Sequence, residues 1–426
     1  MFFFLLQVNG YVTMKYISKK KILLSHPTGN ANVRAWTKAL HRQQLLESFH
    51  TSIACFQGTF LYRIGVGPLE NFRRREFDKT LQAHTHTYPW KELGRMVFTK
   101  LGWKYLTKHE SGPFCVDAVY HYLDACVARY IRNKHIQIDA VYAYEDGALQ
   151  TFQAAKRYGK NCLYELPIGY WRAMRELLEE EQQTNPAWAM TLGGFQDSEA
   201  KLARKDHELA LADRIFVASS FTKQTLQSFP GELSDIAVVP YGFPPVNLRR
   251  TYQPLKGRKM KLLFVGGLSQ RKGISYLFEA IKGLESAVEL TVVGSGSIDA
   301  CPALKKALAV VRYIPSLPHV EILKLMATHD LLVFPSLFEG FGLVVTEAMS
   351  QGTPVITTER TCGPDIITSG KDGWIIPAGT AEPIRELLEI LIARPEKLQQ
   401  VGESARQTAA ARPWRCYGEE MLSFTS

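Results

Sequence analysis

The stretch from Phe334 to Ile356, FPSLFEGFGLVVTEAMSQGTPVI, constrains the fold of this chain more than any other feature. The apolar run that leads into it predicts a short buried parallel strand over residues 331–334, which a Pro-Ser pair ends. Gly340 and Gly342 then allow the backbone to come close to a ligand. Apolar residues at helical spacing predict a helix over residues 343–350, and the glycine and proline after it are stop signals. The stretch therefore predicts a strand, a glycine-containing loop and a helix, in that order.

Two carboxylates, Glu339 and Glu347, flank the glycine turn with the spacing E-x7-E. One lies in the loop and the other about a turn and a half into the helix, so both can face one pocket. A carboxylate can accept two hydroxyl protons at once, which suits vicinal diols on ribose or a hexose. The first helical turn also leaves N–H groups unpaired at Phe341, Gly342 and Leu343, which suits an anion. Together these groups indicate a nucleotide sugar, whereas the alternative is an ordinary helix N-terminus with acidic residues.

The segment FEGFGLVVTEAMSQGTPVI closely resembles the E-x7-E element of retaining glycosyltransferases of family 4. The loop, both glutamates and the Gly-x-Pro-Val ending occur in the family's order, which is more specific than a glycine pair alone. The resemblance implies an α/β fold of the GT-B type, with two Rossmann-like, doubly wound domains that face each other across a cleft. It also implies a C-terminal helix that crosses back to the first domain. A chain of 426 residues is long enough for two such domains.

The motifs and the proline-containing linker suggest the domain boundaries. Residues 15–245 are the expected N-terminal acceptor domain, and residues 246–412 are the expected nucleotide-sugar donor domain. The crossing helix is expected within residues 413–426. Residues 1–14 are expected to be disordered or a mis-annotated start, because a cleaner domain opening begins at Met14. The apolar start is too short to span a bilayer and no later segment reaches eighteen apolar residues, so we predict no transmembrane helix.

The first domain is expected to open with a strand over residues 21–25 and a turn that contains Gly29 and Asn30. This is typical of a Rossmann-type opening, but the turn lacks the full G-x-G-x-x-G, so NAD binding is poorly supported. In family 4 the corresponding turn reaches the donor diphosphate and the acceptor, and the resemblance thus places Gly29 and Asn30 at the cleft. The alternative for Asn30 and His26 is turn chemistry and helix capping.

Carboxylates follow the predicted strands over residues 139–144 and 161–166, which form a βαβ unit with the helix between them. Because the carboxyl ends of such strands open into the crevice, Glu145, Asp146 and Glu165 are candidates for the cleft. In many family 4 enzymes a histidine lies near the end of a strand like the second of these. Here Glu165 stands at that place, and its catalytic role is left open.

The first half of the chain is the basic half. The net charge is +10; residues 1–250 carry 32 Lys and Arg against 23 Asp and Glu, whereas residues 251–426 carry 19 against 18. Basic and aromatic residues interleave over residues 71–111, which is compatible with nucleic acid, a membrane surface or a sugar-lipid acceptor. We favour a helical surface that covers the acceptor side, with peripheral membrane contact as an option, and predict no nucleic-acid partner. A solvated basic face is the simplest alternative.

The second domain is expected to open with a strand over residues 261–265 and a loop that contains Gly266, Gly267, Arg271 and Lys272. The glycines admit a phosphate close to the backbone, and the two cations supply positive charge beside it. In the family this strand is followed by Gly-Arg-Leu and then Lys-Gly. Lys272 matches the family lysine, Gly267 stands where the arginine is usual, and Arg271 is the candidate substitute for that guanidinium.

Two further loops of the second domain border the nucleoside by the same resemblance. The loop after the predicted strand over residues 289–293 contains Gly294, and the loop at Pro318-His319 usually borders the base. For His319 the alternatives are a ligand role and a helix-capping role.

The function implied by the resemblance is a retaining glycosyltransferase that moves a hexose from a UDP-, GDP- or ADP-sugar to a hydroxyl acceptor, either a glycan or a lipid-linked sugar. The expected setting is bacterial-type cell-surface polysaccharide or glycoconjugate synthesis. The alternatives are a catalytically weak nucleotide-sugar-binding subunit and a GT-B nucleotide-sugar epimerase or hydrolase. The seven scattered cysteines have no Cys-x-x-Cys pairing, so they are expected to be reduced thiols of a cytoplasmic protein, with contact at the inner face of the membrane as an option.

No metal or other cofactor is expected, because lysine and arginine side chains and a helix N-terminus can stabilise the leaving diphosphate. Lys272, Arg271 and Glu339 are the expected catalytic residues, with Glu339 holding the transferred sugar and Glu347 the ribose diol. The expected donor-binding residues are Glu347, Phe341, Gly342, Leu343, Gly266, Gly294, Gly29 and Asn30.

Overall fold

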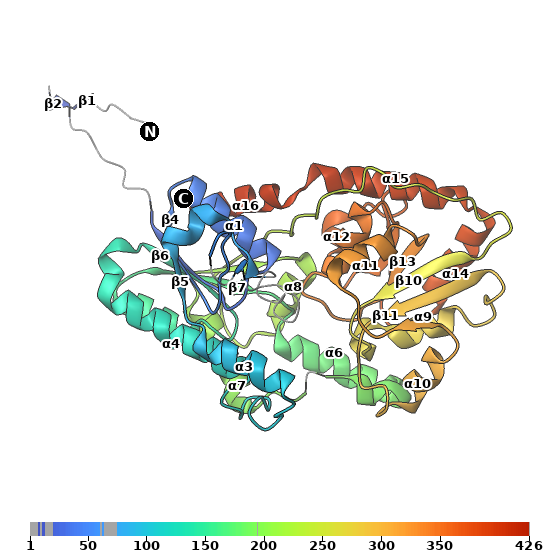
Figure 1. Ribbon diagram of the computed structural model, residues 1–426, viewed down its shortest axis with the longest axis horizontal. Helices are drawn as coiled ribbons and strands as arrows, with labels where there is room; N and C mark the ends of the chain where they lie inside the picture. Colours follow the sequence, from blue (N-terminus) through green and yellow to red (C-terminus); the bar gives the residue numbers. More distant parts are fainter. Residues whose placement is uncertain are drawn as a thin grey trace.

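The computed structural model describes residues 7–8, 11–12, 20–59, 62–63, 75–193 and 195–425. Two parallel β-sheets lie side by side in this part of the chain, and helices cover both (Figure 1). The expectation of disorder or a mis-annotated start over residues 1–14 falls mostly on residues outside this description. Of that stretch the structure describes β1 (Gln7–Val8) and β2 (Tyr11–Val12), which pair antiparallel.

The first sheet has seven parallel strands in the order β5-β4-β3-β6-β7-β8-β9. Its central strands are continuous apolar runs because they are buried on both faces, and Leu23, Val141 and Ile215 are fully buried. The strands are β3 (Ile22–Ser25), β4 (Leu46–Thr51), β5 (Thr85–Thr87), β6 (Ala140–Tyr144), β7 (Asn161–Leu166), β8 (Arg214–Val217) and β9 (Asp235–Val238). The α-helices of this part are α1 (Ala31–Arg42), α3 (Trp90–Lys100), α4 (Val116–Lys134), α5 (Leu149–Arg157), α6 (Trp171–Thr184), α7 (Glu199–Leu211) and α8 (Ser220–Thr225).

The second sheet has six parallel strands in the order β12-β11-β10-β13-β14-β15. Its strands are β10 (Met260–Val265), β11 (Val288–Val293), β12 (Arg312–Ile314), β13 (Leu331–Phe334), β14 (Val355–Thr358) and β15 (Trp374–Ile376). Its α-helices are α9 (Ile274–Ala280), α10 (Pro302–Leu308), α11 (His319–Met326), α12 (Leu343–Ser350), α13 (Gly363–Ile366), α14 (Glu382–Ala393) and α15 (Glu396–Ala411). The strand over 331–334 and the helix over 343–350 have the bounds that the sequence predicts.

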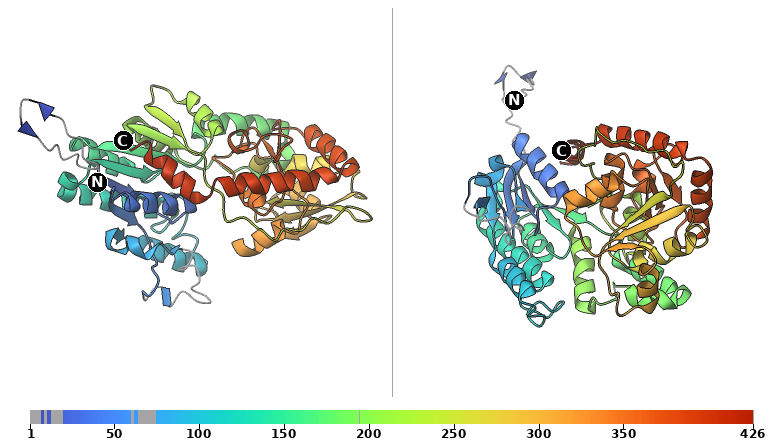
Figure 2. Two further views of the ribbon diagram at one scale, coloured as in Figure 1. Left: turned by 90° about the horizontal axis from the view of Figure 1, so that it is seen from above. Right: turned by 45° about the vertical axis from the view of Figure 1, so that its right-hand side comes forward.

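The last helix, α16 (Trp414–Leu422), follows α15 of the second half and packs against α1 of the first half. Figure 2 shows α15 and α16 as red helices that run from one half of the molecule to the other. The close approach requires a glycine, because a Cβ atom at Gly418 would lie 2.7 Å from the carbonyl oxygen of Ala35. The backbone N–H of Phe243 donates to the carbonyl oxygen of Arg412, 2.9 Å away, where the chain crosses. The predicted crossing of the C-terminal helix is therefore confirmed.

A second connection joins the halves through α6 and the short 3-10 helix η4 (Pro186–Thr191). These elements follow β7 of the first sheet, but they contact α10 and the 3-10 helix η6 (Gln270–Lys272) of the second half. Buried Glu181 of α6 accepts hydrogen bonds from the Tyr276 hydroxyl (2.9 Å) and from Gln270 Nε2 (2.7 Å). The first half thus supports the loop on which Arg271 and Lys272 lie. Among the described residues, no helix is long and apolar enough to cross a membrane.

Candidate active site

The carboxyl ends of strands from both sheets meet at one place, where the loop 335–342 that follows β13 contacts the loop that follows β7. A Cβ atom at Gly340 would lie 1.8 Å from the carbonyl oxygen of Pro167. Only a glycine lets the two backbones approach this closely. The contact brings the E-x7-E segment against the first half of the molecule.

Three charged residues of the second half come together at this place. Lys272 Nζ forms a short hydrogen bond to Glu339 Oε1, and Arg271 Nη1 lies 3.4 Å from the same oxygen. The Ser336 hydroxyl also donates to Glu339 Oε1 (2.7 Å), and Arg271 Nη1 donates to the carbonyl oxygen of Phe338 (2.7 Å). Burial lowers the pKa of Lys272, and the Glu339 carboxylate partly offsets this effect. The structure therefore places all three expected catalytic residues in one cluster.

The backbone of residues 271–273 is fixed against the loop after β13. Gly273 has the left-handed φ of 64°, and a Cβ atom there would lie 1.9 Å from the carbonyl oxygen of Pro335. The Leu337 N–H donates to the carbonyl oxygen of Arg271 (2.9 Å). The position of the two cations thus depends on a glycine and on backbone hydrogen bonds between the loops.

The start of α12 lies next to this cluster. Its N-cap is Gly342, which has a φ of 92° and provides no capping side chain. Phe341 is buried, and its ring packs 4.9 Å from that of Tyr241, so Phe341 presents only its backbone to a ligand. Leu343 is partly exposed. Further along α12, Glu347 Oε1 accepts a hydrogen bond from His319 Nε2 (2.9 Å), and this bond raises the pKa of His319.

The expected phosphate and nucleoside glycines end two neighbouring strands, β10 and β11. A Cβ atom at Gly294 would lie 1.8 Å from the carbonyl oxygen of Gly266, so the two loops pack backbone to backbone. Gly267 is exposed, and no atom of the described residues lies within 4 Å of the position that its Cβ would take. In the family that the chain resembles, this position usually carries an arginine. Here the space that such a side chain would enter is open.

The first half places Gly29 and Asn30 at the start of α1. A Cβ atom at Gly29 would lie 2.6 Å from the ring of Phe77. Asn30 occupies the N-cap position of α1 without a capping hydrogen bond, and its Oδ1 accepts from the Thr28 hydroxyl (3.2 Å). His26 is fully buried, its Nδ1 contacts the carbonyl oxygen of Thr28, and burial lowers its pKa to about 3. The His26 ring is therefore neutral.

The cleft candidates Glu145 and Asp146 interact with α7. Lys205 Nζ lies 3.5 Å from Glu145 Oε1 and 3.7 Å from Asp146 Oδ2. Lys201 Nζ lies 3.9 Å from the same Asp146 oxygen. These carboxylates form ion pairs with the lysines of α7.

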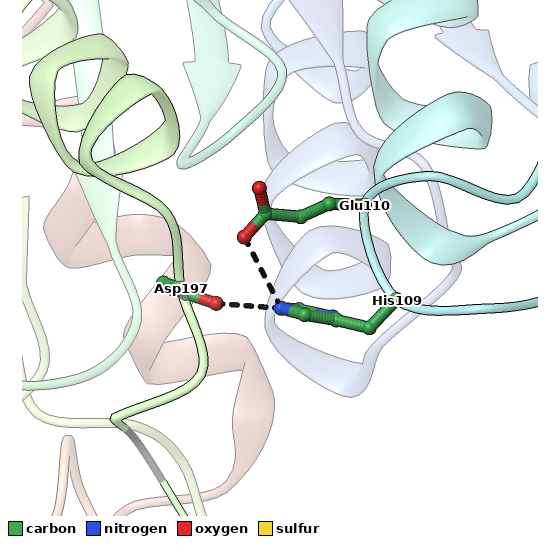
Figure 3. A group of neighbouring side chains, drawn as sticks. All are labelled: His109, Glu110 and Asp197. Carbon is green, nitrogen blue, oxygen red and sulfur yellow. Dashed lines mark hydrogen bonds and ion pairs between the residues drawn. The ribbon is translucent and has the colours of Figure 1, made fainter.

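A group of three side chains continues this network (Figure 3). His109 Nε2 lies 2.9 Å from Asp197 Oδ1 and 3.3 Å from Glu110 Oε1. One nitrogen and two carboxylate oxygens of this group lie close enough together to bind a metal ion. The carboxylates have other partners, however: Lys201 Nζ lies 3.1 Å from Asp197 Oδ1, and Ser198 donates to both oxygens of Glu110. The arrangement is that of an ion-pair network that ties the loop before α4 to α7.

Glu165, at the end of β7, is buried. Its Oε1 accepts hydrogen bonds from Asn32 Nδ2 (2.5 Å) and from the Tyr241 hydroxyl (3.0 Å). Its Oε2 has no hydrogen-bond partner among the residues that the structure describes. Burial raises the pKa of Glu165 to about 7. The residue joins α1, β7 and the segment that follows β9, and it is remote from solvent.

Sequence reasoning gave no role to two hydroxyl groups that contact the E-x7-E loop. Ser219 Oγ and Thr222 Oγ1 both donate to the carbonyl oxygen of Gly340, at 2.7 and 2.9 Å. The order Ser-Ser-Phe-Thr after β8 was the available signal, but its partner lies more than a hundred residues away in the sequence.

Residues 249–408 match the family described as Glycosyl transferases group 1. These residues form a glycosyl transferases group 1 domain. They contain Lys272, Arg271, Glu339 and Glu347. The prediction of family membership is confirmed for this part of the chain.

The chain is similar to curated glycosyltransferases whose names describe different activities. The chain is 27% identical to an MMP α-(1→4)-mannosyltransferase of Mycolicibacterium hassiacum, over 51% of this chain and 53% of that protein. It is 27% identical to the capsular polysaccharide biosynthesis glycosyltransferase CapM of Staphylococcus aureus, over 51% of this chain and 62% of that protein. The aligned region thus spans about half the length of these curated relatives.

Solved structures match nearly the whole chain. Sucrose-phosphate synthase of Thermosynechococcus elongatus has a TM-score of 0.65 at 17% identity and covers 95% of this chain and 98% of its own. HepE of Anabaena in complex with UDP-glucose has a TM-score of 0.60 at 17% identity, with coverage of 95% and 98%. At this identity the likeness shows the fold alone, and the predicted GT-B fold is confirmed.

Proposed function

We propose that this chain is a retaining glycosyltransferase that moves a hexose from a nucleoside diphosphate sugar to a hydroxyl acceptor. The observation that carries the proposal is the cluster of Lys272, Arg271 and Glu339 at the carboxyl ends of β10 and β13, next to the start of α12. In the proposed reaction the bond between the anomeric carbon and the diphosphate oxygen breaks. The acceptor oxygen bonds to the same face of that carbon, and its proton passes to the leaving phosphate.

The two cations provide the charge that this reaction needs. A leaving nucleoside diphosphate gains negative charge on its phosphate oxygens, and fixed donors beside it lower the barrier by roughly 3 kcal/mol each. Lys272 and Arg271 both contact Glu339. A bound diphosphate would take over these contacts and leave the Glu339 carboxylate for the hydroxyl groups of the hexose. The proposal therefore needs no metal ion.

Glu347 is the proposed partner of the ribose hydroxyls. Its side chain is 20% exposed, and its Oε1 is shared with His319, whose side chain is 59% exposed. An imidazole this exposed can give up the carboxylate to a diol. His319 would then border the base.

Two observations support an acceptor on a cell-surface glycan or a lipid-linked sugar. The curated relatives include a capsular polysaccharide enzyme. The first half also presents exposed apolar residues on and after α3 next to lysines, which suits peripheral contact with an anionic membrane. The second candidate function, a catalytically weak nucleotide-sugar-binding subunit, is favoured by the open space at Gly267, where the guanidinium of the resembling family is missing.

Thermal unfolding with a panel of nucleotides tests the donor site. UDP, GDP, ADP and their sugars are added separately to the wild type, to Lys272→Ala and to Lys324→Ala. We expect the nucleotides of one base, uracil, guanine or adenine, to raise the free energy of unfolding of the wild type. The gain should be about 2.7 kcal/mol when the nucleotide is present at about 100 times its dissociation constant. Lys272→Ala loses this stabilisation because it removes the buried cation. Lys324, which is exposed on α11 and paired with Glu321, is the matched control and keeps it.

Acceptor-dependent transfer separates the two candidate functions. A stabilising nucleotide sugar that is consumed when glycan or lipid-linked acceptors are added supports the transferase. A nucleotide sugar that binds and is not turned over favours the binding subunit. Stabilisation that survives in Lys272→Ala, or no stabilisation of the wild type by any nucleotide, would contradict the donor site.

A further inference from the structure

The loop that carries Glu339 inserts into the first half of the molecule. Phe338, one residue earlier, is fully buried against Ala173 of α6 and Phe221 of α8. The rings of Phe221 and Phe338 meet edge to face with their centroids 5.4 Å apart. An apolar side chain of the second half thus fills a site made by helices of the first.

The next peptide is held by two hydroxyl groups of the first half. The carbonyl oxygen of Gly340 accepts from Ser219 Oγ (2.7 Å) and from Thr222 Oγ1 (2.9 Å), and both donor side chains are fully buried. A carbonyl oxygen has two lone pairs, so the two hydroxyls satisfy it completely. The close approach of Pro167 at Gly340 leaves no room for a side chain on this peptide.

One of the two hydroxyls is also held within α8. Ser219 is the N-cap of α8, and its Oγ accepts from the backbone N–H of Thr222 (3.1 Å). The backbone N–H of Ser220 donates to Asp365 Oδ2 of the second half (2.9 Å). The start of α8 therefore contacts the second half at two places, the carbonyl oxygen of Gly340 and the carboxylate of Asp365.

We propose that Ser219 and Thr222 are positioning residues for Glu339. They touch neither donor nor acceptor, but they fix the peptide that follows Glu339 and thereby the direction of its carboxylate. This inference rests on the proposed function, in which Glu339 holds the transferred hexose. It adds that the acceptor-side half of the molecule completes the sugar site. The cations Lys272 and Arg271 also contact this loop, but at residues 335–339, before the peptide that the hydroxyls hold. Their backbone is held in addition by the hydrogen bonds of Gln270 to Glu181 and Thr191, so we expect the diphosphate site to depend less on the two hydroxyls.

Kinetics of conservative variants test the positioning role. The variants are Ser219→Ala, Thr222→Val and Thr222→Ser, assayed with UDP-glucose, GDP-mannose and ADP-glucose for release of the nucleoside diphosphate. We expect Thr222→Val to lower kcat roughly ten- to a hundredfold, because small displacements of a positioning group have effects of this size. Affinity for UDP, GDP or ADP stays within about twofold, since the cations keep their supports. Thr222→Ser keeps a hydroxyl and restores most of kcat.

Thr37→Val is the matched control. Thr37 is also fully buried, and its hydroxyl donates to a backbone carbonyl (Val33, 2.7 Å), but it lies within α1. We expect this variant to keep the wild-type kcat. A parallel loss of kcat in Thr37→Val and Thr222→Val would show a general effect of removing a buried hydroxyl and would overturn the proposal.

Hydrogen exchange separates failure of this inference from failure of the proposed function. Amides of residues 336–342 should exchange faster in Thr222→Val than in the wild type and Thr222→Ser, whether or not any nucleotide sugar is turned over. If the wild type binds no nucleotide, the proposed function fails and this arm still tests the hydroxyl contact. Unchanged exchange in the loop, or a loosened loop with unchanged kcat, would overturn the positioning role.

Discussion

At the scale of single residues, Gly267 is one of the positions where this chain departs from the family that it resembles. It follows β10 on the same edge as Lys272, and its missing side chain would enter open space. We expect Gly267→Arg to strengthen binding of the selected nucleoside diphosphate about tenfold or more, because a charge-assisted hydrogen bond contributes roughly 1.5–3 kcal/mol. Isothermal titration of wild type and variant with UDP, GDP and ADP measures the gain.

The uncharged variant Gly267→Gln is the control for Gly267→Arg. Glutamine fills similar space without a positive charge, so it should leave the affinity near that of the wild type. Equal gains in both variants would mean that the effect comes from contact area or from a stiffer backbone. Equal affinity in all three proteins would mean that Arg271 already provides the guanidinium contact.

The charged cluster could be predicted from sequence because its members lie in short motifs at the ends of adjacent strands. Lys272 and Glu339 follow β10 and β13, which are neighbours in the sheet. The roles of Ser219 and Thr222 could not be predicted in this way. Their shared acceptor belongs to the other half of the molecule, and which groups face each other depends on how the halves dock.

At the scale of elements, α3 presents an unusual outer face. Large apolar side chains on it and just after it are exposed, from 48% for Trp103 to 74% for Trp90. Lysines at positions 100, 104 and 108 are exposed among them. The exposed apolar residues of this face are Trp90, Val97, Leu101, Trp103 and Tyr105. Part of the basic stretch predicted over 71–111, including Arg73 and Arg74, lies outside the described residues.

We expect this face of α3 to bind anionic membranes. Sedimentation with phosphatidylglycerol-containing vesicles should carry down the wild type at low salt and less of it at high salt, since lysines attract anionic lipid. The double variant Trp90→Ser/Trp103→Ser should bind roughly tenfold more weakly, because the exposed ring surface that contacts lipid is lost. Its thermal stability should fall slightly, since Trp103 also stacks on Phe98.

Ile136→Ser is the matched control for the membrane test. Ile136 is 86% exposed and lies outside α3. Its replacement should leave vesicle binding unchanged. Binding that neutral phosphatidylcholine vesicles support equally well, or that the tryptophan variants retain, would leave a solvated face as the better description of α3.

The bounds of an element that glycines delimit could be predicted from the sequence. The contacts of an element that bridges the two halves could not. Helix α12 has the predicted bounds because Gly342 and Gly352 delimit it. Helix α6 follows a strand of the first sheet, yet Glu181 binds Tyr276 and Gln270 of the second half. Local periodicity shows that such a helix is amphipathic, but it contains no information about which half its buried face contacts.

At the scale of the whole molecule, the crossing helix α16 links the two halves. It packs on α1, and Tyr417 on it packs edge to face with Tyr241, 5.4 Å between centroids. Tyr241 in turn contacts both Glu165 and Phe341. A displacement of α16 therefore reaches the loop of Glu339 through a few buried contacts, whereas the backbone of Arg271 and Lys272 is also held by the hydrogen bonds of Gln270 to Glu181 and Thr191.

We expect Gly418→Val to separate donor binding from transfer. Valine improves helix propensity by only a few tenths of a kcal/mol, but its Cβ would lie 2.7 Å from the carbonyl oxygen of Ala35 and 3.1 Å from the Ala39 Cβ, so α16 must move. Overpacking of this kind costs about 1–3 kcal/mol of unfolding free energy. Calorimetry should show a melting temperature a few degrees lower, and kcat should fall while nucleotide affinity stays near that of the wild type. Glu419→Val adds the same residue on the exposed side of the same helix and should change neither. If Gly418→Val weakened nucleotide binding as much as transfer, the donor site would depend on the crossing helix, and the separation between the two sites would be wrong.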